Sequence, residues 1–268
     1  MTAFKTLPFL VLIASAGCTQ PPATSTPTAS AVATEVKATA PDAQSKMERG
    51  YALPGLGHGL CQSPINIDTV SLKADKKHRI TVNFKDEVNK IENLGHTVQL
   101  DFKEGSSITA DGMTFEFTQC HFHTPSEHLI DSVTYPMEMH IVNVAPATPS
   151  QKTPEYLVIG VLFKEGKENK FIAEFLKSVP GQSHTSGDLK VGKVKLADLF
   201  AAAPPSKRRN HYFYKGSLTT PPYTESVRWH IAEHIYEASA AQLEALDKIE
   251  GNNARHVQAL YGRSLLEE

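Results

Sequence analysis

The sequence predicts a mainly β protein with peripheral helices: a single domain built on one large, mostly antiparallel central sheet. The first observation behind this prediction is a series of strand-like runs separated by turn residues. The second is that helical patterns are few and do not alternate regularly with the strands. The strand-like runs are Ile80–Phe84, Val88–Asn93, Thr97–Phe102, Ser107–Ala110, Met113–His123, Glu138–Val144 and Tyr156–Lys164.

Two segments carry a helical pattern instead. Lys170–Val179 has an apolar stripe of helical period, which predicts a helix with one buried face. Ser239 followed three residues later by Gln242 is the signature of a capping box, and Gly251 ends the pattern that follows. We therefore expect a second helix between Ser239 and Gly251.

Composition limits the class of protein. The chain has 268 residues, of which 40% are hydrophobic, and carries 27 basic and 29 acidic side chains. This length and composition allow one sizeable core and indicate a globular protein. Because the net charge is close to zero, no nucleic-acid partner is expected. The sequence does not indicate an oligomeric state.

The first residues read as a targeting segment. The apolar run Leu7–Ala14 follows Lys5 and is too short to span a bilayer, so residues 1–17 are predicted to be a secretory signal peptide. Small residues directly before Cys18 resemble the lipobox of bacterial lipoproteins, in which the cysteine is lipidated. Ordinary signal cleavage after Ala14-Ser15-Ala16 is the alternative.

Lipidation of Cys18 is the favoured alternative because a Pro/Thr/Ala/Ser-rich stretch follows at once. Residues 18–50 contain too few large apolar side chains to form a core and are predicted to be a disordered tether. Residues 51–268 form the globular domain. The expected location is therefore the periplasm or, as a membrane-anchored lipoprotein, the bacterial envelope, with membrane contact only through the lipid anchor.

Residues 119–123 read Gln-Cys-His-Phe-His. Since side chains alternate along a strand, His121 and His123 share one face. Glu138 and His140 share a face of a second strand, which can return antiparallel beside the first. Three imidazoles would then converge on one point, and three protein nitrogens with an open fourth position are typical of a catalytic zinc site.

A polar, solvent-facing strand is the simpler interpretation of a His-x-His pair. Two neighbours argue against it. Gln119 lies two residues before His121, and Glu138 lies two before His140, each on the same face as its histidine. Metal-bound imidazoles usually donate their second N–H to such a group, which fixes the tautomer. The pattern therefore predicts a metal site.

Several separated motifs follow one another along the chain: Gln62-Ser63-Pro64-Ile65-Asn66-Ile67, Gln119–His123, Pro125-Ser126-Glu127-His128, Met137-Glu138-Met139-His140, Tyr214–Pro222 and Asn253-Ala254-Arg255. Together they resemble those of the α-class carbonic anhydrases, and the resemblance extends from about Tyr51 to Arg263. It implies the fold of that family and a catalytic domain that reversibly hydrates carbon dioxide to bicarbonate and a proton.

The resemblance implies a Zn²⁺ cofactor. Its ligands would be His121, His123 and His140. Gln119 and Glu138 would orient His121 and His140, and a backbone carbonyl at Asn253 would orient His123. Zinc lowers the pKa of bound water to about 7, a value established for this enzyme family and not obtained from this sequence. The zinc-bound hydroxide would then attack carbon dioxide.

The resemblance also assigns the remaining site residues. Thr219 would accept a hydrogen bond from the hydroxide and donate its own to Glu127. His96 would be the proton shuttle, a role that suits a side chain which titrates near neutrality. Tyr214 would belong to the hydrogen-bond network. The residues that would contact the substrate are Val142, Val158, Leu218, Thr220, Val227 and Trp229.

Three features depart from the family pattern. The aromatic-rich N-terminal segment of the family is replaced by a short Gly-rich loop, 53–59. Leu94 stands where an asparagine often lines the water chain to the shuttle. Tyr223 occupies the position where many bacterial relatives have a cysteine, so Cys61 lacks its usual partner. We therefore expect Cys61 and Cys120 to be free thiols.

Two other functions fit parts of the sequence. Some family members have lost a zinc histidine and serve only as binding modules, but all three histidines and the Glu127/Thr219 pair are present here. A zinc hydrolase such as an esterase is the other alternative. The apolar wall and the lack of a HExxH-type helix argue against it.

Overall fold

The structure is a computed structural model that describes residues 59–268, except 76, 84, 86, 87, 147, 149–152 and 191. The predicted signal peptide 1–17, the lipidation site Cys18, the tether 18–50 and most of the Gly-rich loop lie outside the described residues. Expectations for those segments therefore stay predictions.

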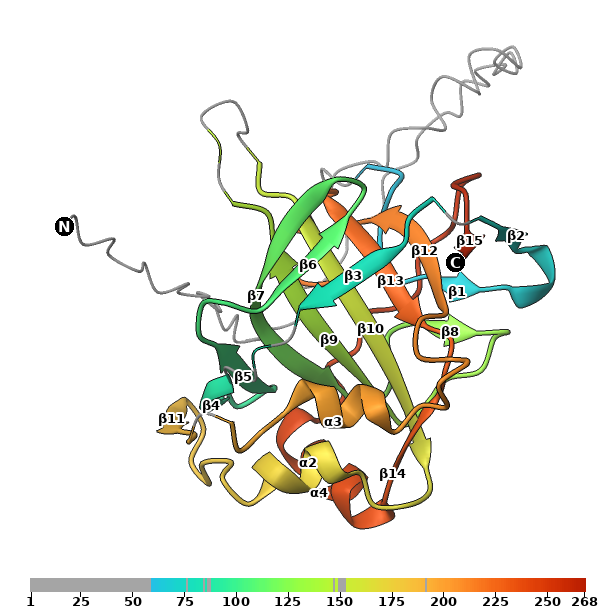
Figure 1. Ribbon diagram of the computed structural model, residues 1–268. Coiled ribbons are helices and arrows are strands. Elements are labelled where there is room, and N and C mark those ends of the chain that lie inside the picture. The colour runs from blue at the N-terminus through green and yellow to red at the C-terminus, as the bar shows by residue number, and fades with distance from the viewer. Residues whose placement is uncertain are drawn as a thin grey trace, which may run out of the picture. The chain divides into compact units, whose positions relative to one another are not determined.

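One large sheet dominates the described part of the chain (Figure 1). Its path runs β11-β4-β5-β7-β9-β10-β13-β12-β15-β2, with β3, β6 and β14 off this path. The strands on the path are β2 (Lys73–Ala74), β4 (Val88–Asn93), β5 (Val98–Phe102), β7 (Met113–His123), β9 (Met137–Val144), β10 (Tyr156–Glu165), β11 (Thr185–Asp188), β12 (His211–Gly216), β13 (Val227–Ala232) and β15 (Leu266–Glu267).

The other elements are short or lie at the edges of this sheet. A separate two-stranded sheet joins β1 to β8. The remaining elements are β1 (Asn66–Ile67), the 3₁₀ helix η1 (Thr69–Ser71), β3 (Ile80–Asn83), β6 (Ser107–Ala110), β8 (Leu129–Ile130), β14 (Tyr236–Ala238), α2 (Lys170–Leu176), α3 (Leu196–Ala201) and α4 (Ala240–Glu250).

The predicted fold class is confirmed: the described part of the chain is mainly strand, and most strand pairs are antiparallel. The sheet is nevertheless mixed, because β10 pairs in parallel with both β13 and β14. Each predicted strand is present, with ends that differ by a residue or two. The helix predicted over Lys170–Val179 ends at Leu176 instead, because Pro180 keeps the residue before it out of the helical region.

The helix predicted between Ser239 and Gly251 is confirmed as α4. The side chain of Ser239 accepts from Gln242 N, and the Gln242 side chain accepts from Ser239 N, so the capping box is complete. The sequence did not predict β12, β13 or α3. Polar residues such as His211 and His230 interrupt the apolar pattern of β12 and β13, and α3 is too short to show a helical period.

The central strands bury both faces. On β10, Leu157, Ile159, Val161 and Phe163 belong to one hydrophobic cluster, and Val158 and Leu162 belong to another. This alternation follows the two-residue period of a strand. The first cluster also contains the buried side chains of α2, α3 and α4, which lie together at one end of the sheet in Figure 1. The second cluster lies on the opposite face.

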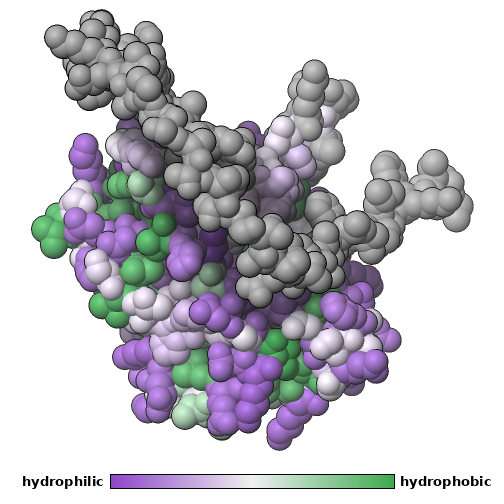
Figure 2. All heavy atoms as spheres, turned by 180° about the vertical axis from the view of Figure 1, so that it is seen from behind, coloured by the Kyte–Doolittle hydropathy of each residue, from purple (hydrophilic) through white to green (hydrophobic). Residues whose placement is uncertain are grey.

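None of the described helices is long and apolar enough to cross a membrane. Figure 2 shows the domain from behind, with hydrophobic and hydrophilic side chains interspersed over the described residues that are visible there. This view therefore offers no broad apolar surface for docking.

Cys61 and Cys120 are free thiols in the described structure, as predicted. Cys120 is completely buried between β5 and β9, and burial raises the pKa of its thiol. A thiol titration of the denatured, unreduced domain that lacks Cys18 should therefore count both cysteines. The folded domain should react slowly at Cys120, because only the thiolate is nucleophilic. A count of zero in a monomer would show that the two cysteines pair.

Candidate metal centre

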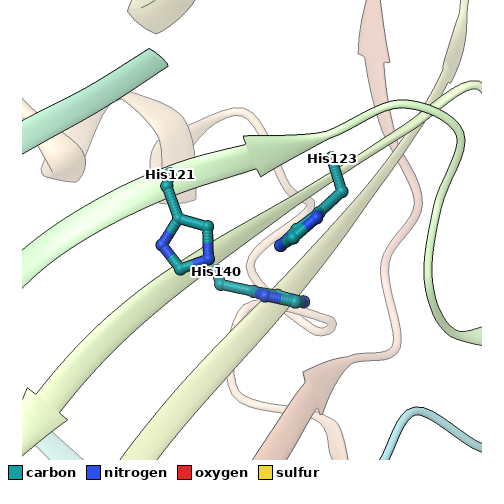
Figure 3. Close-up of side chains that lie close together, drawn as sticks. All are labelled: His121, His123 and His140. Atoms are coloured by element: carbon teal, nitrogen blue, oxygen red, sulfur yellow. The ribbon is translucent and has the colours of Figure 1, made fainter. Parts of the chain in front are cut away.

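The register of β7 and β9 brings the three histidines together. The strands pair antiparallel, with His121 directly opposite His140 and His123 opposite Glu138. A register irregularity between Phe117 and Gln119 precedes this stretch. The prediction that the second strand returns antiparallel beside the first is therefore confirmed, and Figure 3 shows the three imidazoles pointing toward one another.

The imidazoles form a compact cluster. Ring centroids are 5.0 Å apart for His121 and His123, 5.3 Å for His121 and His140, and 4.5 Å for His123 and His140. One nitrogen from each ring lies within 4.8 Å of the other two. His123 and His140 are buried, and His121 is half-buried.

Hydrogen bonds occupy one ring nitrogen of His121 and one of His140. His121 Nδ1 lies 2.8 Å from Gln119 Oε1, and His140 Nε2 lies 2.9 Å from Glu138 Oε1. Because these oxygens accept, the lone pairs of the neutral rings are on His121 Nε2 and His140 Nδ1. Neither ring nitrogen of His123 has a partner. A buried nitrogen without a partner is unfavourable, so this donor set fits a transition metal such as zinc.

The electrostatics keep two of the rings neutral. Burial, with the two neighbouring histidines, lowers the pKa of His121 well below its usual value, and burial lowers that of His123 to about 3. Burial also acts against the charged form of His140, but Glu138 outweighs it and raises the pKa. A metal needs neutral imidazoles, and the surroundings of His121 and His123 favour them.

Glu138 is a completely buried carboxylate that accepts four hydrogen bonds. Oε2 accepts from the backbone N–H groups of Glu127 and His128 at 2.9 and 2.8 Å. Oε1 accepts from His128 Nδ1 at 2.7 Å and from His140 Nε2 at 2.9 Å. Despite burial, the two histidines hold its pKa well below the usual range. The ionised carboxylate thus fixes the orientation of His140.

A buried chain of polar side chains extends from Glu138. His128 Nε2 lies 2.6 Å from the Tyr214 hydroxyl, which lies 2.8 Å from Ser63 Oγ. The predicted place of Tyr214 in the hydrogen-bond network is therefore present in the structure. This series of hydrogen bonds connects β9 with the loop after β7, with β12 and with the segment before β1. It therefore holds the histidine cluster against the rest of the domain.

Glu127 faces the cluster from the same loop. Its Oε1 accepts from Arg255 N at 2.9 Å, and its Oε2 lies 3.7 Å from His123 Nε2 and 3.9 Å from His140 Nδ1. Burial raises the pKa of Glu127, while the Thr219 hydroxyl lies close enough to lower it. Oε2 itself makes no hydrogen bond. Glu127 and Thr219 are therefore neighbours, as the resemblance implies.

The predicted substrate wall is a real cluster of apolar side chains. Four of its members are buried in the same hydrophobic cluster, and Leu218 packs against that cluster. The Trp229 ring lies 4.8 Å from the His140 ring, centroid to centroid. Thr220 is exposed and does not belong to the wall. The four buried members are Val142, Val158, Val227 and Trp229.

His96 lies exposed in the turn between β4 and β5, with Nδ1 3.1 Å from the carbonyl oxygen of Leu94. The amide of Asn253 donates to the carbonyl oxygens of His96 and Phe122 at 2.8 and 3.2 Å. Asn253 contacts His123 through both its side chain and its backbone, and both contacts raise the pKa of His123 against burial. Its side chain therefore ties the His96 turn to the end of β7, a contact that the sequence did not predict.

The sequence analysis also gave no role to His128, Ser63 or Arg255. His128 and Ser63 belong to the buried chain, and the Arg255 guanidinium donates to Gln62 Oε1 and to the Ser63 carbonyl at 2.9 and 2.7 Å. The sequence did contain a signal for these three residues. Each residue lies inside one of the motifs that carry the family resemblance, and none lies on a predicted strand.

This fold and this site together define an α-class carbonic anhydrase. The model of the eukaryotic-type carbonic anhydrase family matches residues 52–268. The carbonic anhydrase of Neisseria gonorrhoeae is 36% identical over 231 residues, which cover 85% of this chain and 84% of that protein. The chain therefore belongs to the carbonic anhydrase family, whose enzymes act on carbon dioxide and bicarbonate.

Solved structures agree with this assignment. The α-carbonic anhydrase of Photobacterium profundum superposes with a TM-score of 0.69 at 34% identity, covering 78% of this chain and 90% of that one. A hyperthermostable carbonic anhydrase from a hydrothermal vent chimney gives the same TM-score at 37% identity, covering 78% and 88%.

Glu250 should make stability depend on pH. Burial raises its pKa to about 8, although hydrogen bonds from Val98 N, Thr97 and Asn253 favour the ionised form. The free side chain titrates near pH 4.3, so the folded state holds this proton more tightly. The stabilisation of the folded state that comes from this proton is complete below about pH 4 and is lost as the pH rises to about 8.

We expect Glu250→Gln, which stays neutral, to weaken this pH dependence. Its melting temperature relative to the parent should rise by several degrees between pH 5 and pH 8.5. Thermal melts across that range measure the difference. Glu168→Gln, at an exposed position, is the control and should follow the parent. Parallel curves for Glu250→Gln and the parent would contradict this account.

Proposed function

We propose that this chain binds one zinc ion through His121 Nε2, a ring nitrogen of His123 and His140 Nδ1 and hydrates carbon dioxide there. The observation that carries the proposal is the set of three converging imidazoles, whose nitrogens lie within 4.8 Å of one another, with both ring nitrogens of buried His123 unpartnered. The other nitrogens of His121 and His140 are already occupied by Gln119 and Glu138. Carbon dioxide hydration by the purified domain, with and without a chelator, is the direct test.

A bound zinc ion supplies a Lewis acid that lowers the pKa of a water ligand toward neutrality. The side chains of Thr219 and Glu127 orient the reacting groups. The hydroxyl of Thr219 would donate to Glu127 Oε2, the oxygen that has no other partner, and its own oxygen would then be available only as an acceptor toward the reacting hydroxyl group. Arg255 N holds the other oxygen of Glu127 in place at 2.9 Å. Orientation of this kind lowers the barrier of the attack step.

The apolar wall supplies the place for carbon dioxide. Val142, Val158, Val227 and Trp229 are almost completely buried side chains without charge, and the Trp229 indole N–H donates to the Ser217 carbonyl at 3.0 Å. Trp229 therefore offers only its apolar ring to the cluster. A neutral, apolar substrate gains from such a surface, and bicarbonate, which is charged, does not.

His96 is the proposed acceptor of the proton that the reaction releases. It is exposed at the turn between β4 and β5, and its backbone carbonyl is held by Asn253, which also contacts the end of β7. A shuttle must reach solvent and stay in a fixed place relative to the metal cluster. The exposure of His96 gives it access to solvent, and the hydrogen bond from the Asn253 amide keeps it in place.

The domain is proposed to be exported. The signal-like residues 1–17, the small residues before Cys18 and the following tether support this proposal. Lipidation at Cys18 would anchor the domain to a membrane of the bacterial envelope, and cleavage without lipidation would leave it in the periplasm. The mass of the mature N-terminal peptide separates the two: a lipidated cysteine at position 18 supports anchoring, and an unmodified N-terminus excludes it.

Metal analysis of His140→Ala is expected to show most of the zinc lost, together with the hydration activity. Two ligands bind zinc far more weakly than three, and the variant also leaves Glu138 without one donor. His256→Ala, at an exposed histidine, is the matched control and should keep both. Full retention of metal and activity in His140→Ala would contradict the ligand assignment.

Thr219→Ala is expected to keep zinc but to slow hydration about a hundredfold, because positioning acts on the attack step and not on metal affinity. Thr219 is nine-tenths buried beside Glu127, whereas Thr114 is exposed on β7, so Thr114→Ala is the control. Zinc content and kcat are the measurements. Hydration as fast as in the parent would exclude the orienting role of Thr219.

Proton transfer is expected to be inefficient. Leu94 removes a polar side chain from the expected water path to His96, and water relays need donors and acceptors at their sides. Turnover at saturating carbon dioxide should therefore depend strongly on external buffer. Leu94→Asn should relieve this dependence, and His96→Ala should deepen it until small imidazole buffers are added. Turnover insensitive to buffer and to His96→Ala would exclude His96 as the shuttle.

A further inference from the structure

A cavity lined by both polar and apolar side chains lies on the opposite face of the central sheet from the histidine cluster. Trp229 and His230 are successive residues of β13, so Trp229 faces the metal cluster and His230 faces away. The cavity measures about 460 Å³. In Figure 1, β3 lies over this face of β10 and β13. The lining residues used below are Ile80, Val82, Ile159, Arg209, His211 and His230.

Two buried histidines in this cavity lack hydrogen-bond partners. His230 is 1% exposed and His211 is 5% exposed. Both ring nitrogens of His230 and Nε2 of His211 have no partner, and the two ring centroids are 4.7 Å apart. His211 Nδ1 lies 3.0 Å from the Arg209 carbonyl and donates to it. Buried polar atoms without partners are unfavourable, so a ligand that pairs with them is favoured.

Positive side chains outnumber negative ones around the cavity. Arg208 and Arg209 both line it, and the Arg209 side chain makes no hydrogen bond or ion pair with the described residues. Burial, and then the charges of His211, His78 and Arg228, act against a positive charge on His230, while Glu268 is the opposing negative charge on the His211 side. Among the described residues, no third metal-ligating side chain joins His211 and His230 in a cluster. A divalent cation would therefore meet repulsion and too few ligands.

Most of the other lining residues are apolar, although Thr81, Arg208 and Asn210 also line the cavity. Ile80 and Val82 of β3 lie across from Ile159 of β10, with Phe200 and Ala232 beside them. A volume of about 460 Å³ is far larger than a single inorganic anion needs and falls in the range of small-molecule sites. The cavity thus combines an apolar body with a few convergent polar groups, which is the usual composition of such a site.

We propose that this cavity binds a small organic carboxylate whose apolar body packs on Ile80, Val82 and Ile159 and whose carboxylate pairs with His230, His211 and Arg209. With one proton taken up by His211, its Nε2–H and the single N–H of neutral His230 would both be donors without competing partners. The carboxylate oxygens have enough lone pairs to accept both of them together with the guanidinium. The site is independent of the metal centre, since no residue is shared.

Binding at this site takes up a proton. Burial lowers the pKa values of both His211 and His230, so both rings are neutral before binding. The charged and titratable groups around them are Glu268, which favours the charged form of His211, and His78 and Arg228, which disfavour a charge on His230. A bound carboxylate adds a second negative charge beside Glu268. Affinity should therefore rise as the pH falls from 8 to 6, by up to about tenfold per unit for one proton.

Calorimetric titration with benzoate tests the proposal on the metal-loaded domain. We expect saturable binding that tightens as the pH falls, and weaker or no binding of acetate, which lacks the apolar body, and of benzamide, which lacks the charge. His230→Phe keeps an aromatic ring without nitrogens and should weaken benzoate binding at least about tenfold. Arg209→Gln, at an exposed position that does not threaten the fold, should weaken it severalfold.

Two controls separate this site from the metal centre and from general charge effects. Lys177→Gln removes a positive charge at an exposed position outside the cavity and should leave the affinity unchanged. Removal of the metal with a chelator should also leave it unchanged. The proposal is overturned if the parent shows no saturable binding, if Arg209→Gln and any folded His230→Phe bind like the parent, or if binding disappears with the metal.

Discussion

The ionised carboxylate of Glu138 is the constraint on which the site depends. A charge without access to water is tolerated only when its hydrogen bonds are complete, and Glu138 has four donors from three residues. Two of the donors are backbone groups of the loop after β7, and one is the metal-facing ring of His140. The same carboxylate therefore fixes the position of Glu127 and the tautomer of His140. Hydrogen bonds within the protein therefore orient the rings of His121 and His140.

The local part of this arrangement follows from the sequence. The two-residue period of a strand places His121 and His123 on one face, and the short connection to the next strand makes antiparallel pairing with His140 the simplest outcome. Gln119 and Glu138 follow from the same period. The pairing of β10 with β13 could not be predicted in this way, because parallel partners far apart in sequence leave no local signal. The apolar wall across from His140 was known only through the family resemblance.

Contacts between side chains of distant segments are the other part that the sequence hides. The amide of Asn253 contacts carbonyl groups near the start of β5 and the end of β7, and nothing in its neighbourhood indicates those partners. The family resemblance implies a backbone contact with His123, and the structure adds hydrogen bonds from the Asn253 side chain to these carbonyl groups. The hydrogen bonds that run from Glu138 through His128 and Tyr214 to Ser63 likewise join four segments. Such networks depend on how the strands are ordered, and only the fold determines that order.

The register of β10 and β13 separates the two faces of the sheet, because Val158 pairs with Trp229 and Ile159 pairs with His230. A shift of one residue would exchange the faces of every side chain on β13. Trp229 would then leave the wall beside His140, and His230 would enter it. Gly160 leaves room on the metal-facing side: a Cβ atom there would lie 2.5 Å from the side chain of Ile231 and 3.0 Å from Glu138 Oε1, so a larger residue would displace Ile231 and crowd Glu138. This register therefore keeps the apolar wall and the cavity lined by His230 on opposite faces of the same strand.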